Sequence, residues 1–160
     1  MAALASFLLL VVGGGLVIGY VTAPGDWYAT LAKPAFTPPD WVFAPAWTLL
    51  YILIAVAGWR IWRRRPGPAD ADADAGRQHL SLPAGLWAVQ LALNFLWSPA
   101  FFAAHQVGLA LAIVAALLAC ILAFIATAWR ADRVAALLFL PYAAWTAYAT
   151  ALNAAILALN

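Results

Sequence analysis

The sequence predicts an all-α membrane protein, a bundle of five transmembrane helices with an ordered loop rich in proline and tryptophan between the first two. The 160-residue chain is 68% hydrophobic and 9% charged, whereas soluble domains are about 45–50% apolar and roughly 25% charged. Every charged side chain lies in one of three short patches, Asp26–Asp40, Arg60–Arg77 and Arg130–Arg133. The stretches between them approach or exceed the roughly 20 apolar residues that a membrane helix needs. We therefore treat residues 1–160 as a single membrane domain.

The first two helices are expected over residues 4–22 and 45–62. The first is apolar throughout, and no basic residue precedes Lys33. Because a signal peptide begins with a positive segment, we interpret residues 4–22 as a retained helix. The second begins at Pro45, and proline suits the first turn of a helix because the N–H that it lacks has no partner there.

The other three helices are expected over residues 80–102, 107–129 and 134–157. The third and fourth share one uncharged stretch, which is interrupted at Ser98-Pro99 and again at residues 105–108, His-Gln-Val-Gly. Arg130–Arg133 separates the fourth helix from the fifth. Arginines also border the stretch of residues 63–79, which is rich in alanine and aspartate and reads as a flexible linker. By the positive-inside rule these two arginine patches face the cytoplasm, which predicts a bacterial inner membrane protein.

The loop of residues 23–44 is predicted to be an ordered lid over the other end of the bundle. It combines large aromatic side chains with four prolines, Pro24, Pro34, Pro38 and Pro39. Prolines reduce the conformational freedom that an ordered loop must lose. The alternative is an interfacial anchor, because tryptophan and tyrosine favour the depth of the lipid headgroups.

Polar residues within the predicted helices fall on stripes. Gln90, Asn94 and Ser98 are spaced four residues apart and share one helix face, and Tyr142, Trp145 and Asn153 share another. An amide in hydrocarbon needs a hydrogen-bond partner, so both stripes should face the bundle interior. There they either bond one helix to the next or, with the aromatic side chains near them, line a pocket for a flat apolar ligand.

The composition argues against several other function classes. The net charge of +2 is too small to suggest nucleic acid. The only histidines, His79 and His105, lie near helix ends and Cys120 is the single cysteine, so we predict no metal site, no required cofactor and no conventional catalytic residues. Gly15 and Gly19 form a small-residue pair that permits close helix approach, within the fold or in a homodimer.

Three ordered blocks then carry a family resemblance. They are residues 27–51, with the run Leu-Ala-Lys-Pro-Ala-Phe-Thr-Pro-Pro-Asp-Trp at 31–41; residues 90–99, Gln-Leu-Ala-Leu-Asn-Phe-Leu-Trp-Ser-Pro; and Pro141–Trp145 with Ala151–Asn153. Together they resemble the TspO/MBR family of tryptophan-rich sensory proteins, which includes the mitochondrial translocator protein, and most of all its members from photosynthetic proteobacteria.

The resemblance implies a five-helix bundle, usually a homodimer, and a membrane receptor or carrier for tetrapyrroles such as protoporphyrin IX or haem-type molecules. In bacteria it implies a part in tetrapyrrole transport and in regulating pigment synthesis by oxygen or light, and some relatives are assigned to the outer membrane. Light-dependent porphyrin degradation and a structural protein that binds sterol or lipid are the alternatives. The implied ligand-binding residues are Trp41, Trp47, Tyr51, Asn94, Trp97, Trp145 and Tyr148.

Overall fold

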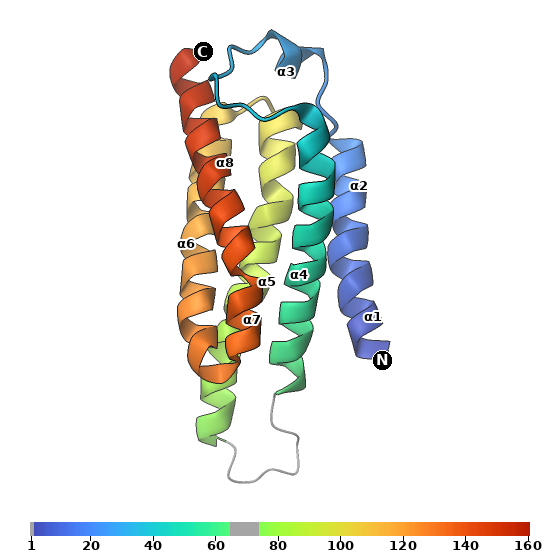
Figure 1. Cartoon of the computed structure of the whole chain (residues 1–160), viewed down its shortest axis with the longest axis vertical. Helices are drawn as coiled ribbons and strands as arrows, with labels where there is room; N and C mark the ends of the chain where they lie inside the picture. Colours follow the sequence, from blue (N-terminus) through green and yellow to red (C-terminus); the bar gives the residue numbers. More distant parts are fainter. Residues whose placement is uncertain (1, 65–73) are drawn as a thin grey trace.

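The structure, a computed structural model, describes residues 2–64 and 74–160, with the side chains of residues 74–81 left out. Helices run side by side along the long axis, and the loop that carries α3 lies across one end (Figure 1). The N-terminus lies at the other end and the C-terminus lies beside the loop. In chain order the helical elements are α1 (Ala2–Leu8), η1 (Leu9–Gly13), α2 (Gly14–Val21), α3 (Asp26–Thr30), η2 (Asp40–Val42), α4 (Phe43–Arg63), α5 (Asp74–Ser98), η3 (Pro99–Ala103), α6 (Val107–Ala131), α7 (Arg133–Leu138) and α8 (Leu140–Leu159).

Five helical segments in the described part of the chain are long and apolar enough to cross a membrane. They are Ala2–Val21, Asp40–Arg63, Leu82–Ala103, Val107–Ala131 and Arg133–Leu159. The prediction of an all-α bundle of five membrane-spanning helices is therefore confirmed.

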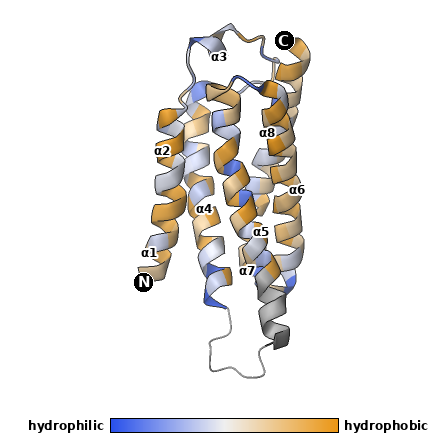
Figure 2. Ribbon diagram, turned by 180° about the vertical axis from the view of Figure 1, so that it is seen from behind, coloured by the Kyte–Doolittle hydropathy of each residue, from blue (hydrophilic) through white to orange (hydrophobic). Residues whose placement is uncertain are grey.

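The outward surface of the bundle is apolar, as a lipid-facing surface must be. Hydrophobic residues make up most of the length of the helices, and hydrophilic ones lie near the two ends and at a few positions within the bundle (Figure 2). Leu9 and Leu16 are 75% and 66% exposed, and Leu122 is 53% exposed. Contiguous apolar surface of this extent is disfavoured in water and matches the hydrocarbon of a bilayer.

Two prolines account for irregularities in the spans. Pro99 starts the π-helical turn η3, and Pro141 follows Phe139, the residue at which α7 gives way to α8. Proline has no N–H and its ring crowds the preceding turn, so the regular bonding of a helix is interrupted around it. The third and fifth spans are thus each assembled from two helical elements.

Helix bounds differ from the sequence-based expectation at the second loop and the second helix. Residues 74–79 were expected in the linker, but α5 begins at Asp74. Arg63, also expected in the linker, ends α4, and α4 begins at Phe43 before Pro45. Residues 65–73 of the expected linker lie outside the described residues.

An ion cluster ties α4 to the junction of α6 and α7 at the end of the bundle opposite the loop, which we call the arginine end. Arg60 donates from Nε and Nη2 to the two carboxylate oxygens of Asp132, both at 3.1 Å. Arg64 Nε lies 2.8 Å from the same carboxylate, whose side chain is only 2% exposed. Asp132 also caps α7 by accepting the backbone N–H groups of Val134 and Ala135.

These bonds determine the protonation of Asp132. Burial by itself raises the pKa of a carboxyl group. The hydrogen bonds from Arg60 and the Ala135 N–H, with the charges of Arg60 and Arg64, outweigh it and hold the pKa of Asp132 below its ordinary value. Asp132 is therefore ionised at neutral pH.

The arginine half of the bundle is close-packed. The rings of Phe124 and Phe139 lie 4.0 Å apart between centroids, and both side chains are fully buried. Trp87 packs against Gly58 and donates its indole N–H to the Ile54 carbonyl at 2.9 Å. A Cβ added at Gly58 would collide with the Trp87 ring, so only glycine fits this contact.

Candidate ligand cavity

A cavity of about 720 Å³ lies between the helices under the loop, at what we call the lid end. Residues of α2, α4, α5, η3, α6 and α8 form its walls, and Tyr28 of α3 is among its lining residues. Small-molecule sites in proteins are clefts of about 300–1,000 Å³ lined mainly by apolar and aromatic side chains. The cavity therefore has the size of a ligand site.

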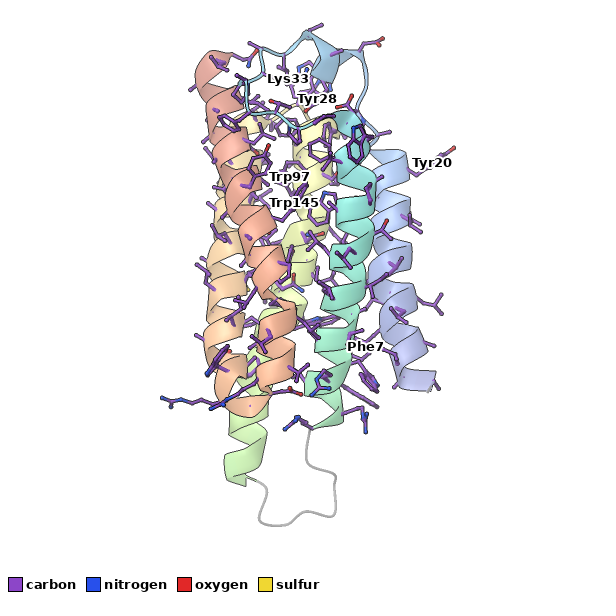
Figure 3. All side chains as sticks on the ribbon, in the orientation of Figure 1. Phe7, Tyr20, Tyr28, Lys33, Trp97 and Trp145 are labelled. Atoms are coloured by element: carbon purple, nitrogen blue, oxygen red, sulfur yellow. The ribbon has the colours of Figure 1, made fainter. Side chains whose placement is uncertain are left out.

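Aromatic side chains from several helices form most of the wall. Trp47 and Tyr51 of α4 lie 5.2 Å apart between ring centroids, and the Phe43 ring meets Trp145 of α8 at 5.9 Å. Trp97 of α5 stacks on Phe101 of η3 at 5.4 Å with 24° between the rings. Trp97 and Trp145 both line the cavity, and Figure 3 shows both below the lid. The arrangement presents ring surfaces to whatever occupies the cavity.

Two buried amides connect the helices at different depths. Asn94 donates to the Tyr142 hydroxyl at 2.7 Å and accepts from the Tyr51 hydroxyl at 3.2 Å, which joins α5 to α8 and α4. Asn153 accepts the Trp97 indole N–H at 3.1 Å and donates to the Val107 carbonyl at 3.0 Å. Asn94 and Asn153 both line the cavity. They therefore bond helices together and also supply its few polar atoms, since each amide oxygen has a second lone pair.

The lid is fastened to the bundle at three places. Asn160 accepts the Ala32 N–H at 3.0 Å and donates to the Ala32 carbonyl at 3.1 Å. The Tyr148 hydroxyl donates to the Phe36 carbonyl at 2.7 Å. Trp27 stacks on the His105 ring with centroids 4.1 Å apart and 16° between the planes. These contacts support an ordered lid.

Charged groups gather where the lid meets the cavity. The Lys33 ammonium lies 4.4 Å from the centre of the Tyr28 ring, and Figure 3 shows both side chains at the lid. Burial, then the charge of Asp40 and the neighbouring Tyr148, raise the pKa of Tyr28. Tyr28 therefore stays neutral at physiological pH, and Lys33 and Asp40 place one charge of each sign near the mouth.

Comparison with known proteins identifies the family of this cavity-bearing bundle. The sequence model of the TspO/MBR family matches residues 6–159. The chain belongs to the TspO/MBR family. With its five apolar spans, this TspO/MBR protein is an integral, multi-pass membrane protein.

Individual TspO/MBR relatives match over most of their length. Protein CrtK of Rhodobacter capsulatus is 35% identical over 142 residues, which cover 89% of this chain and 83% of that protein. The translocator protein of Sus scrofa is 39% identical over 143 residues, 88% of this chain and 79% of that protein. The tryptophan-rich sensory protein of Cereibacter sphaeroides is 35% identical over 148 residues, 92% and 85% respectively.

Most of the residues that the TspO/MBR resemblance implies as ligand-binding lie in the cavity wall. Trp47, Tyr51, Asn94, Trp97 and Trp145 line it. The other two do not. Trp41 is 74% exposed in η2, and Tyr148 fastens the lid.

Trp41 lies in the short 3₁₀ helix η2, before α4 begins, whereas its neighbours Asp40 and Phe43 line the cavity. Within α4 the positions that line the cavity follow the helical repeat. They are Phe43, Ala44, Trp47, Thr48 and Tyr51. The same repeat would have added Phe101 and Thr146 to the implied ligand-binding set, and Asn153, which the sequence placed on an inward-facing stripe, also lines the cavity.

Gln90, Gly15 and Gly19, which the sequence also singled out, lie partly in the core and partly in the cavity wall. Gln90 is fully buried and donates to the Trp87 carbonyl at 2.9 Å, so it belongs to the core. Gly15 packs on the Tyr51 ring of its own chain, which uses that glycine inside the fold. Gly19 lines the cavity, and an added Cβ there would meet no atom within 4 Å. A homodimer through this glycine face stays a prediction.

Proposed function

We propose that this protein is a membrane receptor or carrier that binds a tetrapyrrole, such as protoporphyrin IX or a haem-type molecule, in the cavity at the lid end. Membership of the TspO/MBR family and the translocator and sensory proteins among its relatives support a receptor or carrier role. The tetrapyrrole is the ligand that the family resemblance implies, and the aromatic lining of the cavity supports it.

The observation that carries the proposal is the wall of the cavity. Trp47, Trp97 and Trp145 come from three helices and surround one space of about 720 Å³. Aromatic side chains prefer offset-stacked or edge-to-face contacts with other rings. A flat, largely apolar macrocycle satisfies such walls, and the few polar atoms of Asn94 and Asn153 leave the lining mainly apolar.

The carboxylates of the ligand belong at the lid. Burying a charge in an apolar site is costly, so the propionate groups would remain near water. Lys33 lies beside Tyr28, which lines the cavity, and can pair with a propionate. The macrocycle would then extend from the lid toward the Asn94 and Tyr142 pair.

The membrane orientation follows from the cations. Arg60, Arg64, Arg130 and Arg133 lie together at the arginine end, where Arg63 ends α4, and Lys33 lies at the lid end (Figure 3). In a bacterial inner membrane this places the arginine end in the cytoplasm and the lid outside. In that orientation the protein would take up or report a tetrapyrrole, and so contribute to tetrapyrrole transport and to regulating pigment synthesis in response to oxygen or light.

The test is a titration of the purified protein with protoporphyrin IX, followed by quenching of tryptophan fluorescence and by porphyrin absorbance. We expect saturable binding that Trp47→Phe and Trp145→Phe each weaken by about threefold to tenfold, the equivalent of an aromatic contact. Trp129→Phe at the arginine end is the matched control and should keep the wild-type affinity.

A Trp41→Phe variant tests the one tryptophan of the implied set that lies outside the cavity. Wild-type affinity in this variant is the result that the cavity predicts. Non-saturable quenching that ignores Trp47→Phe and Trp145→Phe would mean that porphyrin only partitions into the micelle, and the proposal would fail. Illumination of the complex adds one observation, because a defined product lost with those tryptophans would indicate the degrading activity instead.

A further inference from the structure

The cavity has two boundaries of different character. Toward the lid it is closed by the Asn160–Ala32 pair, the Tyr148 hydrogen bond and the Trp27–His105 stack. Toward α2 and α4 its wall is itself exposed on the outside of the bundle. The exposed lining residues of these two helices are Leu16, Gly19 and Tyr20 of α2 and Ala44 and Thr48 of α4, which we call the α2–α4 seam.

The seam opens because the first membrane span changes neighbours along its length. Its first half, α1 and η1, packs along α4, whereas α2 packs chiefly against α5. Gly14 contacts the Phe95 ring of α5, and the Thr22 hydroxyl hydrogen-bonds Ser98 at the end of α5. Gly15 meets Tyr51 of α4, and α2 continues from there toward α5. The seam lies beyond that contact.

The side chains of the seam leave it uncovered. Leu16 is 66% and Tyr20 87% exposed, and Figure 3 shows Tyr20 pointing away from the bundle. An added Cβ at Gly19 would meet open space. The Thr48 hydroxyl already donates to the Ala44 carbonyl at 2.8 Å, so it needs no water.

The seam also lies at membrane depth. Its residues belong to the candidate spans Ala2–Val21 and Asp40–Arg63, so the opening faces lipid and not water. A ligand that is largely apolar dissolves in the bilayer, where its concentration is far higher than in water. An opening of this kind is therefore suited to a ligand that arrives from the membrane.

We propose that the α2–α4 seam is a lateral portal through which the apolar macrocycle passes between the bilayer and the cavity while the lid stays fastened. The proposal rests on the tetrapyrrole function proposed above and adds its route. The lid then closes the aqueous side, and the membrane is the compartment from which the protein collects its ligand.

The experiment measures association and dissociation rates of protoporphyrin IX with the protein in lipid vesicles. Gly19→Phe and Ala44→Phe obstruct the portal from its two sides. Each should slow association by at least about fivefold and dissociation by a similar factor, since an obstacle on the route hinders both directions. Gly13→Phe is the matched control, because Gly13 has the same open surroundings on the same span but does not line the cavity.

Asn160→Ala is the opposing variant, because it removes both hydrogen bonds between Asn160 and Ala32. Entry through the seam predicts unchanged rates for Asn160→Ala and Gly13→Phe. The proposal is overturned if Gly19→Phe and Ala44→Phe, each shown to be folded by circular dichroism, keep wild-type rates, or if Asn160→Ala accelerates both rates. If the wild-type protein shows no saturable porphyrin binding, the proposed function is overturned. If binding is saturable but the seam variants keep wild-type rates, only the portal is overturned.

Discussion

The lid end and the arginine end of this bundle are made from the same membrane-spanning helices, but the side chains pack closely at the arginine end and leave a cavity at the lid end. At the arginine end, aromatic rings pack against glycine and against each other, and Arg60 and Arg64 share the buried carboxylate of Asp132. At the lid end the aromatic side chains surround an open space of about 720 Å³. Close packing in one half thus accompanies a cavity in the other, and the substitutions below should separate stability from ligand binding.

The largest effect on stability is expected at Asp132. Asp132→Ala removes the partner of two arginines and the cap of α7 at once, so we expect a loss of about 3 kcal/mol in the free energy of unfolding. Unfolding in mixed micelles measures it. Asp132→Asn keeps an acceptor for the α7 N–H groups and should lose less; equal losses in the two variants would show that the cap contributes nothing.

Replacing a glycine by alanine should change the free energy of unfolding differently at the two ends of the bundle. Gly58→Ala places a Cβ against the Trp87 ring and should cost about 2 kcal/mol by overpacking. Gly19→Ala meets open space and should leave the unfolding free energy within about 0.5 kcal/mol of wild type or raise it slightly, since alanine favours a helix. The same unfolding assay compares the two. A tolerated Gly58→Ala would contradict the close contact between α4 and α5.

Trp97 should affect both stability and ligand binding, because it lines the cavity and donates a hydrogen bond to Asn153. Trp97→Phe keeps an aromatic ring but removes the N–H that Asn153 accepts. We expect a loss of about 1 kcal/mol in stability, together with weaker porphyrin binding. Trp129→Phe provides the comparison at the exposed surface. Unchanged stability and porphyrin affinity in Trp97→Phe would show that the indole N–H of Trp97 contributes to neither.

The smallest effect is a pH dependence at the arginine end. The pKa of Asp132 is lowered in the folded protein, so the stability from its ionised form is complete above the ordinary pKa of 3.8 and is lost as the pH falls below it. Unfolding measured from neutral pH down through this range should show the loss. Asp132→Asn should reduce the dependence of the unfolding free energy on pH in this range. An unchanged dependence would mean that other carboxyl groups cause the loss of stability.

Sequence reasoning reached the arrangement of spans because hydrocarbon imposes simple rules. Charges are expelled, about 20 apolar residues are needed, and the polar side chains that remain must face inward. Asn94, Trp97 and Trp145 were predictable for that reason. The start of α5 at Asp74 was not, because alternating alanine and aspartate are compatible with either a linker or a helix.

The sequence predicted an ordered lid, but neither the open seam nor the contacts that fasten the lid could be predicted from it. Asn160 and Ala32 are far apart in the chain, and no local pattern signals their hydrogen bonds. The glycine pair of the first span indicated close approach without naming the partner. The structure shows that Gly15 meets Tyr51 and that Gly19 lines the cavity, so one motif has two different uses.

The nine tryptophans allow the most direct test of the central claim, because they are divided between the two ends. Incorporating 5-fluorotryptophan and recording ¹⁹F NMR spectra with and without protoporphyrin IX would report each position separately, with assignments from single substitutions. Ring-current shifts should be confined to the cavity tryptophans and their lid neighbours. We predict the largest shifts at Trp47, Trp97 and Trp145 and none at the tryptophans of the arginine half, Trp59, Trp62, Trp87 and Trp129. Equal shifts at both ends, or shifts confined to the arginine half, would contradict a tetrapyrrole site in the cavity.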